Sequence, residues 1–247
     1  MEAFLCLKLE FMKFRKSFLK FIFIFPAALY ISILSIGLHF KRASFLKYGN
    51  LKDGFSGLLL ANHLMLFWPF ILLLCVISVS IYLFYIETAN NSLTSVCSSK
   101  LKRSSIYLGK WMLLILSTFL LILIGDLALA VTAKLFNIPM KENGLLFKYT
   151  CFEFLCSFGL ISFQMFLTSL FKSIETSAVI SLIAAVVFNA IGAGKDLVPY
   201  IPYLCFTNST PFSNTTILRK TILVSLIYFI VFLILGIINF NFRDIRE

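Results

Sequence analysis

The chain has 247 residues, of which 60% are hydrophobic and only 13% are charged, and its mean hydropathy is +0.96. A soluble domain of this length would carry about twice that share of charge to cover its surface. The net charge of +11 does not indicate nucleic-acid binding, because the cations gather at the ends of apolar runs, where anionic headgroups lie. The composition excludes a soluble globular domain and indicates a polytopic membrane protein.

The apolar residues form long continuous runs. Several exceed the roughly 18 residues that mark a bilayer span, and they lack the alternation of membrane strands, so helices are expected. The sequence predicts an all-α polytopic membrane protein, a single transmembrane domain over residues 1–247, with 41–62 and 195–220 as its longer loops. The six predicted spans cover residues 18–40, 63–86, 111–136, 149–171, 176–194 and 221–240.

The first residues predict a helix that lies in the headgroup layer before the chain enters the bilayer. Over residues 3–18, five apolar side chains share one narrow stripe of a helix, and lysines fall on the other side. The stripe consists of Phe4, Leu7, Phe11, Phe14 and Phe18, and the lysines are Lys13, Lys16 and Lys20. A cytosolic extension of the first span is the alternative.

Six spans place both termini on one side of the membrane, and lysine and arginine residues decide which side. With the N-terminus inside, 12 of the 22 basic residues lie inside, which is a weak bias. The leader usually dominates orientation, and it carries five of these cations. Both termini are therefore expected to be cytoplasmic.

Three polar residues inside the predicted spans are candidates for a functional role, namely Asp126, Glu153 and Asn189. Asp126 is central in the third span, where a carboxylate costs about 2.5–3.5 kcal/mol on the insertion scale, so it is expected to face protein or water. It is interpreted either as a carboxylate of a translocation path or as an interhelical hydrogen-bonding group. Glu153 is expected within about a turn of the outer surface, where it carries less weight.

The fifth predicted span differs from the others in its small residues. Serine, alanine and glycine gather around Asn189, and small residues allow close helix contact in lipid. We expect this span to be central, either within the bundle or at a subunit contact. The phenylalanine-rich first, fourth and sixth spans can face lipid.

The chain shows no residue set for catalysis or metal binding. Residues 192–195 (GAGK) resemble the end of a P-loop, but Asn189 replaces the first glycine and Asp196 replaces the serine or threonine. The six cysteines lack metal-ligand spacing, and His39 and His63 stand alone at predicted span ends, where packing is expected. The chain is therefore not expected to be an enzyme or to bind ATP or another cofactor directly.

The amphipathic, basic stretch between the second and third spans, the 87–110 segment, is the best place to meet a soluble partner. Its apolar positions share one helix face, Asn91 or Ser92 can cap that helix, and Ser104 and Ser105 open the third span. The apolar face consists of Leu93, Val96, Cys97 and Leu101, and the cations are Lys100, Lys102, Arg103 and Lys110. A short docking helix and a solvated linker both fit this pattern.

Four stretches carry a family resemblance. They are the leader 9–17 (LEFMKFRKS), the Pro69 span that ends in Glu87 and precedes Asn91, the basic-Ser stretch 99–103 that leads to Lys110, and 197–202 (LVPYIP) after the fifth span. In this order they resemble the permease subunit of ABC-2-type transporters, and within that group they are similar to lantibiotic-immunity and bacitracin-export permeases. The proline that many relatives carry before the basic-Ser stretch is missing here.

The resemblance implies a permease subunit without an ATPase site of its own. A separate ATP-binding cassette subunit would bind ATP, and two permease chains, identical or related, would pair with two such subunits. The coupling residues would be Glu87, Asn91, Leu93, Val96, Lys100 and Arg103. The 195–220 loop would dip back into the outer leaflet. The expected cargo is an amphipathic peptide such as a lantibiotic, exported from a bacterial plasma membrane for self-immunity and antibiotic resistance.

Other functions stay open from the sequence. An ABC-2 permease for another antibiotic, a lipid or an ion would leave the same pattern. A secondary transporter that uses Asp126 for its coupling ion is the alternative from another class, although the glycine-interrupted helix pairs of that class are not evident. An intramembrane enzyme lacks paired catalytic residues.

Overall fold

The computed structural model describes residues 2–15, 20–47, 54–64, 68–89, 101–140, 144–171, 173–191, 200–205, 210–212 and 214–242. Every regular element within these ranges is an α-helix, which confirms the predicted all-α fold. The helices are α1 (Glu2–Arg15), α2 (Lys20–Leu46), α3 (Gly54–Leu64), α4 (Trp68–Ala89), α6 (Arg103–Leu135), α7 (Leu145–Leu170), α8 (Ile174–Ile191) and α9 (Thr215–Phe242).

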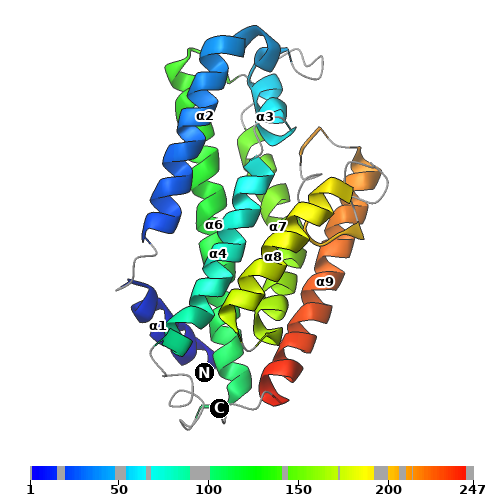
Figure 1. Cartoon of the computed structure of the whole chain (residues 1–247). Coiled ribbons are helices and arrows are strands. Elements are labelled where there is room, and N and C mark those ends of the chain that lie inside the picture. Colours follow the sequence, from blue (N-terminus) through cyan, green and yellow to red (C-terminus); the bar gives the residue numbers. More distant parts are fainter. Residues whose placement is uncertain are drawn as a thin grey trace.

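Five of the described helices are long and apolar enough to cross a membrane, namely α2, α4, α6, α7 and α9. The apolar part of α8, Ile174–Phe188, is shorter, so the structure supports five of the six predicted spans. Helix α6 has 33 residues and is about 50 Å long, whereas the hydrocarbon core is about 30 Å thick. In Figure 1, α1, the end of α4, the start of α6 and the end of α9 gather at one end of the bundle.

The predicted loop 41–62 is wrong, because most of it is helical. Helix α2 continues through a kink at Lys41 (φ −129°, ψ 32°) to Leu46, and α3 (Gly54–Leu64) follows. The sequence of α3 is apolar and glycine-containing without a clear period, so it reads as a loop, yet most of its side chains are buried against α2 and α4. His63 therefore lies near the end of α3, and the next long helix begins at Trp68 instead of at residue 63.

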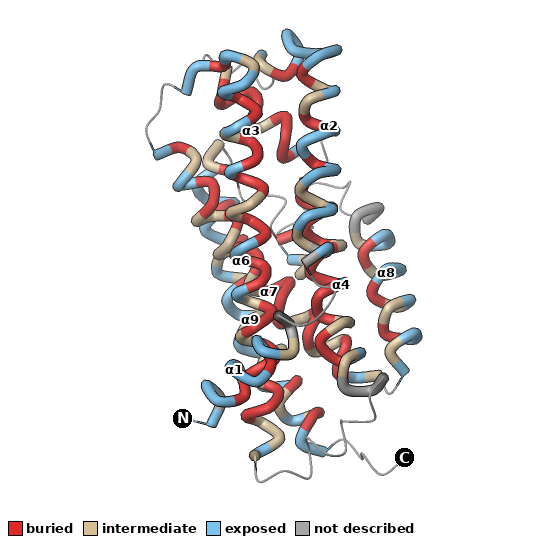
Figure 2. The backbone as a smooth tube through the Cα atoms, turned by 90° about the vertical axis from the view of Figure 1, so that its left-hand side faces the viewer, coloured by how far each residue is buried: buried red, intermediate tan, exposed pale blue. Residues whose placement is uncertain are grey.

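The centre of the bundle is α7, which packs against α4, α6, α8 and α9. Only 17% of the most apolar stretch of α2 or of α9 is buried, against 50% for α7. Figure 2 shows much of α2 in blue, which marks exposed residues. The first and sixth predicted spans thus face outward as expected. The fourth predicted span, α7, leaves less of its surface to lipid than these two, because four helices pack against it.

The small-residue helix α8 lies at the periphery of the chain, so the prediction that it is central in the bundle is wrong for this subunit (Figure 2). Its buried stripe is Ser177, Ser181 and Ala185, which packs toward α4 and α7. Its opposite face exposes the large apolar side chains Val179, Leu182, Ile183, Val186 and Val187. The small residues therefore serve one face only, and a subunit contact on the other face stays a prediction.

A close approach at Gly159 joins α7 to α9. The Gly159 amide donates to Ser225 Oγ at 2.9 Å, and Ser225 Oγ donates to the Cys156 carbonyl oxygen at 2.9 Å. A Cβ atom at Gly159 would lie 3.2 Å from Ser225 Cα and from its carbonyl oxygen. Helix contact in lipid depends on such small residues and interhelical hydrogen bonds.

Gly159→Leu is expected to force α7 away from α9 and to lower the free energy of unfolding by about 1–3 kcal/mol, the usual cost of overpacking. Gly159→Ala should cost less, because only the Cβ atom must be accommodated. Reversible denaturation of the full chain in detergent, followed by circular dichroism, measures both. Val131→Leu, on a residue that is 56% exposed, is the control. Unchanged stability of Gly159→Leu would contradict the close packing.

Candidate functional site

A buried lysine lies where α1, α4 and α6 meet. The side chain of Lys110 is 0% exposed, and its Nζ donates to Glu10 Oε2 at 3.2 Å and to the Leu83 carbonyl oxygen at 2.8 Å. Lys13 Nζ lies 3.0 Å from the other oxygen, Glu10 Oε1. We call Glu10, Lys13, Leu83 and Lys110 the Lys110 junction. It connects three helices through one ammonium group.

Helix α1 reaches the junction through one narrow face. Cys6 and Glu10 are four residues apart and both buried, so they form one line toward α6. A Cβ atom at Gly109 would lie 2.8 Å from Cys6 Cβ, so only glycine lets α1 cross α6 this closely. The side chains of Phe4 and Phe11 are 73% and 48% exposed, which leaves part of the predicted aromatic stripe open for the headgroup layer.

The junction is also an electrostatic unit. Burying an ammonium group away from both water and a carboxylate would cost several kcal/mol of folding free energy. Removing one partner of a buried ion pair typically destabilises a protein by about 3–5 kcal/mol. Burial, assisted by the negative charges of Glu10 and Glu2, raises the pKa of the Cys6 thiol above its usual value. The Cys6 thiol therefore reports whether α1 is docked, because a docked thiol is both covered and protonated.

Most of the predicted coupling residues lie outside the described residues. These are Asn91, Leu93, Val96 and Lys100. Glu87 lies in the last turn of α4, where its side chain is not described, and Arg103 is the first residue of α6. Arg103 Nη1 donates to the Asn241 carbonyl oxygen at 3.1 Å, near the end of α9. The helix expected within the 87–110 segment is therefore not tested.

The structure brings Asp126 and Glu153 together with side chains that were not predicted to join them. Asp126 is 3% exposed and accepts a hydrogen bond from Thr150 of α7. Glu153 is fully buried, which is deeper than the sequence indicated, and it accepts a hydrogen bond from the Tyr149 hydroxyl at 3.2 Å. His63 is not isolated, because its Nδ1 lies 2.8 Å from that hydroxyl. The side chain of Asn189 is not described.

A second polar centre surrounds Gln164 in the middle of α7. Its Nε2 donates to hydroxyl groups on three helices at 2.9–3.1 Å, and its Oε1 accepts from the Tyr203 hydroxyl at 2.6 Å. The three hydroxyl groups belong to Ser80, Thr168 and Ser181. Tyr203 is 0% exposed, so residues 200–205 of the predicted 195–220 loop are anchored within the bundle. The end of that predicted loop is wrong, because α9 begins at Thr215.

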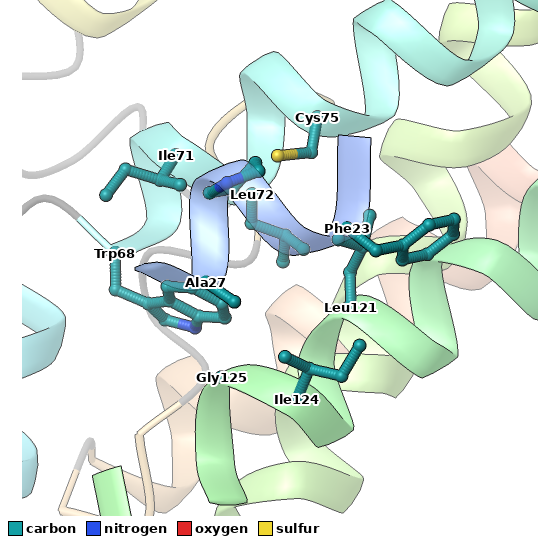
Figure 3. A pocket seen from close by; sticks show the side chains of 10 residues that line it. Phe23, Ala27, Trp68, Ile71, Leu72, Cys75, Leu121, Ile124 and Gly125 are labelled. Carbon is teal, nitrogen blue, oxygen red and sulfur yellow. The ribbon is translucent and has the colours of Figure 1, made fainter. Parts of the chain in front are cut away.

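A small apolar pocket opens between α2, α4 and α6 (Figure 3). It has an empty volume of about 250 Å³, part of which is open to the surroundings. Its lining consists of Phe23, Pro26, Ala27, Trp68, Ile71, Leu72, Cys75, Leu121, Ile124 and Gly125. Within the described ranges, no group of three or more His, Cys, Asp or Glu residues is placed to hold a metal ion. This surface suits an apolar ligand.

Sequence reasoning missed the pairing of Glu10 with Lys110. Both residues stand in motifs of the resemblance, yet they are 100 positions apart and nothing local links them. One signal was present: Lys110 directly precedes an apolar run, so its ammonium needs a partner, and Glu10 is one of two acids in a basic leader.

Comparison with known families gives one finding. A family model described as ABC-2 family transporter protein matches residues 6–192, from the buried face of α1 to the end of α8. No curated protein matches the chain.

Lys110→Met is expected to undock α1 and to speed the labelling of Cys6 by a water-soluble maleimide about tenfold or more, which corresponds to about 1.4 kcal/mol of docking free energy. Replacement of Cys97 and Cys151 by serine removes background labelling. Lys102→Met, at an exposed lysine of the same segment, is the matched control and should label like the parent. Equal labelling of the two variants would show that the ion pair does not hold α1.

Proposed function

Because the chain belongs to the ABC-2 family of transporter proteins, we propose that it is the membrane-spanning permease subunit of an ATP-driven exporter. It is a multi-pass membrane protein. In this proposal the cargo crosses the membrane along this chain, and ATP is hydrolysed on another subunit. The cofactor of the system is ATP, which a separate ATP-binding cassette subunit binds and hydrolyses.

The Lys110 junction is the observation that best supports a coupling role. The 87–110 segment leaves α4 at one end and enters α6 at the other, and Lys110 holds both neighbours, through the Leu83 carbonyl of α4 and through its own place on α6. It also holds α1 through Glu10. A displacement of the segment would therefore move α1, α4 and α6 together. In this proposal the ATP-binding subunit docks on the segment, and Glu87, Asn91, Leu93, Val96, Lys100 and Arg103 form its contact.

The assembly would contain two permease chains, identical or related, with two ATP-binding subunits. In this proposal, α8 is the helix through which the two permease chains meet. The membrane would be the plasma membrane of a bacterium, with both termini in the cytoplasm, where the ATP-binding subunits reside.

The proposed cargo is an amphipathic peptide of the lantibiotic type, removed from the membrane for self-immunity. The resemblance of four ordered motifs to lantibiotic-immunity permeases supports this choice. Export of another antibiotic, a lipid or an ion by the same family is the competing cargo class.

The double substitution Leu93→Asp and Val96→Asp is expected to abolish co-purification of the ATP-binding subunit, because two carboxylates would replace the apolar docking face. Co-purification from membranes with a tagged permease measures the loss, and the helical circular dichroism of the permease should not change. Ser95→Asp, on the opposite face of the expected helix, is the control. Retention of the partner by the double variant would reduce the segment to a linker.

Deletion of this chain is expected to sensitise the cell to a lantibiotic and not to unrelated drugs, since only a membrane-bound peptide would need this exporter. Minimal inhibitory concentrations with and without the chain measure the effect. Equal sensitisation to chemically unrelated drugs would contradict a peptide cargo while leaving the permease assignment intact.

A further inference from the structure

Two carboxyl groups are buried side by side within the spans. Asp126 on α6 and Glu153 on α7 are 3% and 0% exposed. Thr150, which bonds to Asp126, is three residues before Glu153 and therefore lies on the same face of α7, and the two carboxyl groups interact electrostatically. Glu153 is eight residues from the start of α7, or about 12 Å along the helix axis.

No lysine or arginine in the described part of the chain pairs with either carboxyl group. The ion-pair partner of Glu153 is His63, whose Nδ1 lies 4.0 Å from Oε1. The titratable groups that face the pair are Tyr30 from α2, His63 from α3, and Tyr149 and Cys156 from α7, while α4 contributes the uncharged Trp68. Two ionised carboxylates would leave this region with an uncompensated negative charge, which lipid surroundings disfavour strongly.

The hydrogen bonds around Asp126 leave room for a proton on the pair. The Thr150 hydroxyl has one hydrogen, yet its oxygen is bonded both to Asp126 Oδ2 and to the Leu146 carbonyl oxygen, at 2.9 Å from the latter. A carbonyl oxygen can only accept, so if the hydroxyl donates to Leu146, the Asp126 carboxyl must supply the hydrogen between itself and Thr150.

The hydrogen bonds around Glu153 form a relay. The Tyr149 hydroxyl lies between His63 Nδ1 at 2.8 Å and Glu153 Oε1 at 3.2 Å. If the hydroxyl donates to Glu153, His63 must carry its hydrogen on Nδ1; if a protonated Glu153 donates, the hydroxyl turns to His63. The two arrangements differ in the position of protons and not of heavy atoms, so a proton can pass between the imidazole and the carboxyl group.

A second, separate feature points to the same site. Glu153 Oε2 and Trp68 Nε1 are both buried and lack a hydrogen bond among the described residues. The Trp68 indole lies beside the Glu153 carboxyl, and its ring is 4.6 Å from that of Tyr30. The indole N–H beside this oxygen is an uncharged donor, so it does not neutralise an ionised Glu153, whereas a bound proton removes the charge.

We propose that Asp126 and Glu153 form an intramembrane proton-binding site, which holds at least one proton in this conformation and exchanges it through Tyr149 and His63. The site lies where α3 ends and α4 begins, so a movement that admits water between these helices would let the carboxyl groups ionise and release the proton. Export would then depend on pH in addition to ATP. The proposal does not depend on the cargo or on the ATP-binding partner, so it can fail separately from the proposed function.

Infrared difference spectroscopy of the full chain in lipid nanodiscs, titrated from mildly acidic to mildly alkaline pH, tests the site. The absorption of a protonated carboxyl group is expected to persist at neutral pH and to lose intensity in Glu153→Gln and in Asp126→Asn, both nearly isosteric. Tyr149→Phe should shift the band without removing it. Glu10→Gln, at a carboxyl that is ion-paired in the Lys110 junction, is the matched control and should leave the band unchanged.

Three results would overturn the proposal. Absence of a protonated carboxyl band in the parent chain at neutral pH would show that both groups are ionised, and this outcome needs no variant to fold. A band that appears only after sodium and potassium are replaced by choline would show that a monovalent metal ion, and not a proton, occupies the site. A band that neither substitution changes would belong to another group and would exclude this site as well.

Discussion

The buried ammonium group of Lys110 imposes the constraint on which the packing of α1, α4 and α6 depends. It is fully buried, and the carboxylate of Glu10 and the carbonyl oxygen of Leu83 replace the water that it lacks. Because the loss of these partners would cost several kcal/mol, α1, α4 and α6 are held to one another at the end of the bundle where α4 ends and α6 begins. Gly109 permits the contact by letting α1 cross α6 closely.

The same requirement organises the rest of the bundle. Lipid offers no hydrogen bonds, so each polar side chain must find its partner inside the protein. Many of these partners belong to α7, which supplies Gln164 to α4, to α8 and to the 200–205 turn, Gly159 to α9, and Thr150 and Glu153 to the acidic pair. Helix α7 is therefore central, although its phenylalanines suggest a lipid-facing helix. The aromatic side chains fill the contact with α9, as in the pair Phe163–Phe232.

The sequence was sufficient for the all-α fold, for five spans and for the leader helix, because length and continuous apolarity are local properties. The prediction from sequence was wrong at α3, because its glycines and its lack of a helical period of apolar residues resemble a loop. It was also wrong about the position of α8, because small residues indicate close contact but not on how many sides of the helix. The junction of Glu10 with Lys110 and the relay from His63 to Glu153 depend on pairs far apart in the chain. Composition indicates that such groups need partners, and only the packing of the helices determines which ones meet.

The central claim is that the Lys110 junction transmits work from the ATP-binding subunit to the membrane helices. The direct measurement is the amount of peptide transported per ATP hydrolysed by the reconstituted complex, with Lys110→Met and Glu10→Gln compared singly and together. The account predicts that the complexes assemble and hydrolyse ATP while transport per ATP falls, and that the double variant is no worse than the worse single variant. Unchanged transport per ATP in both single variants would contradict it.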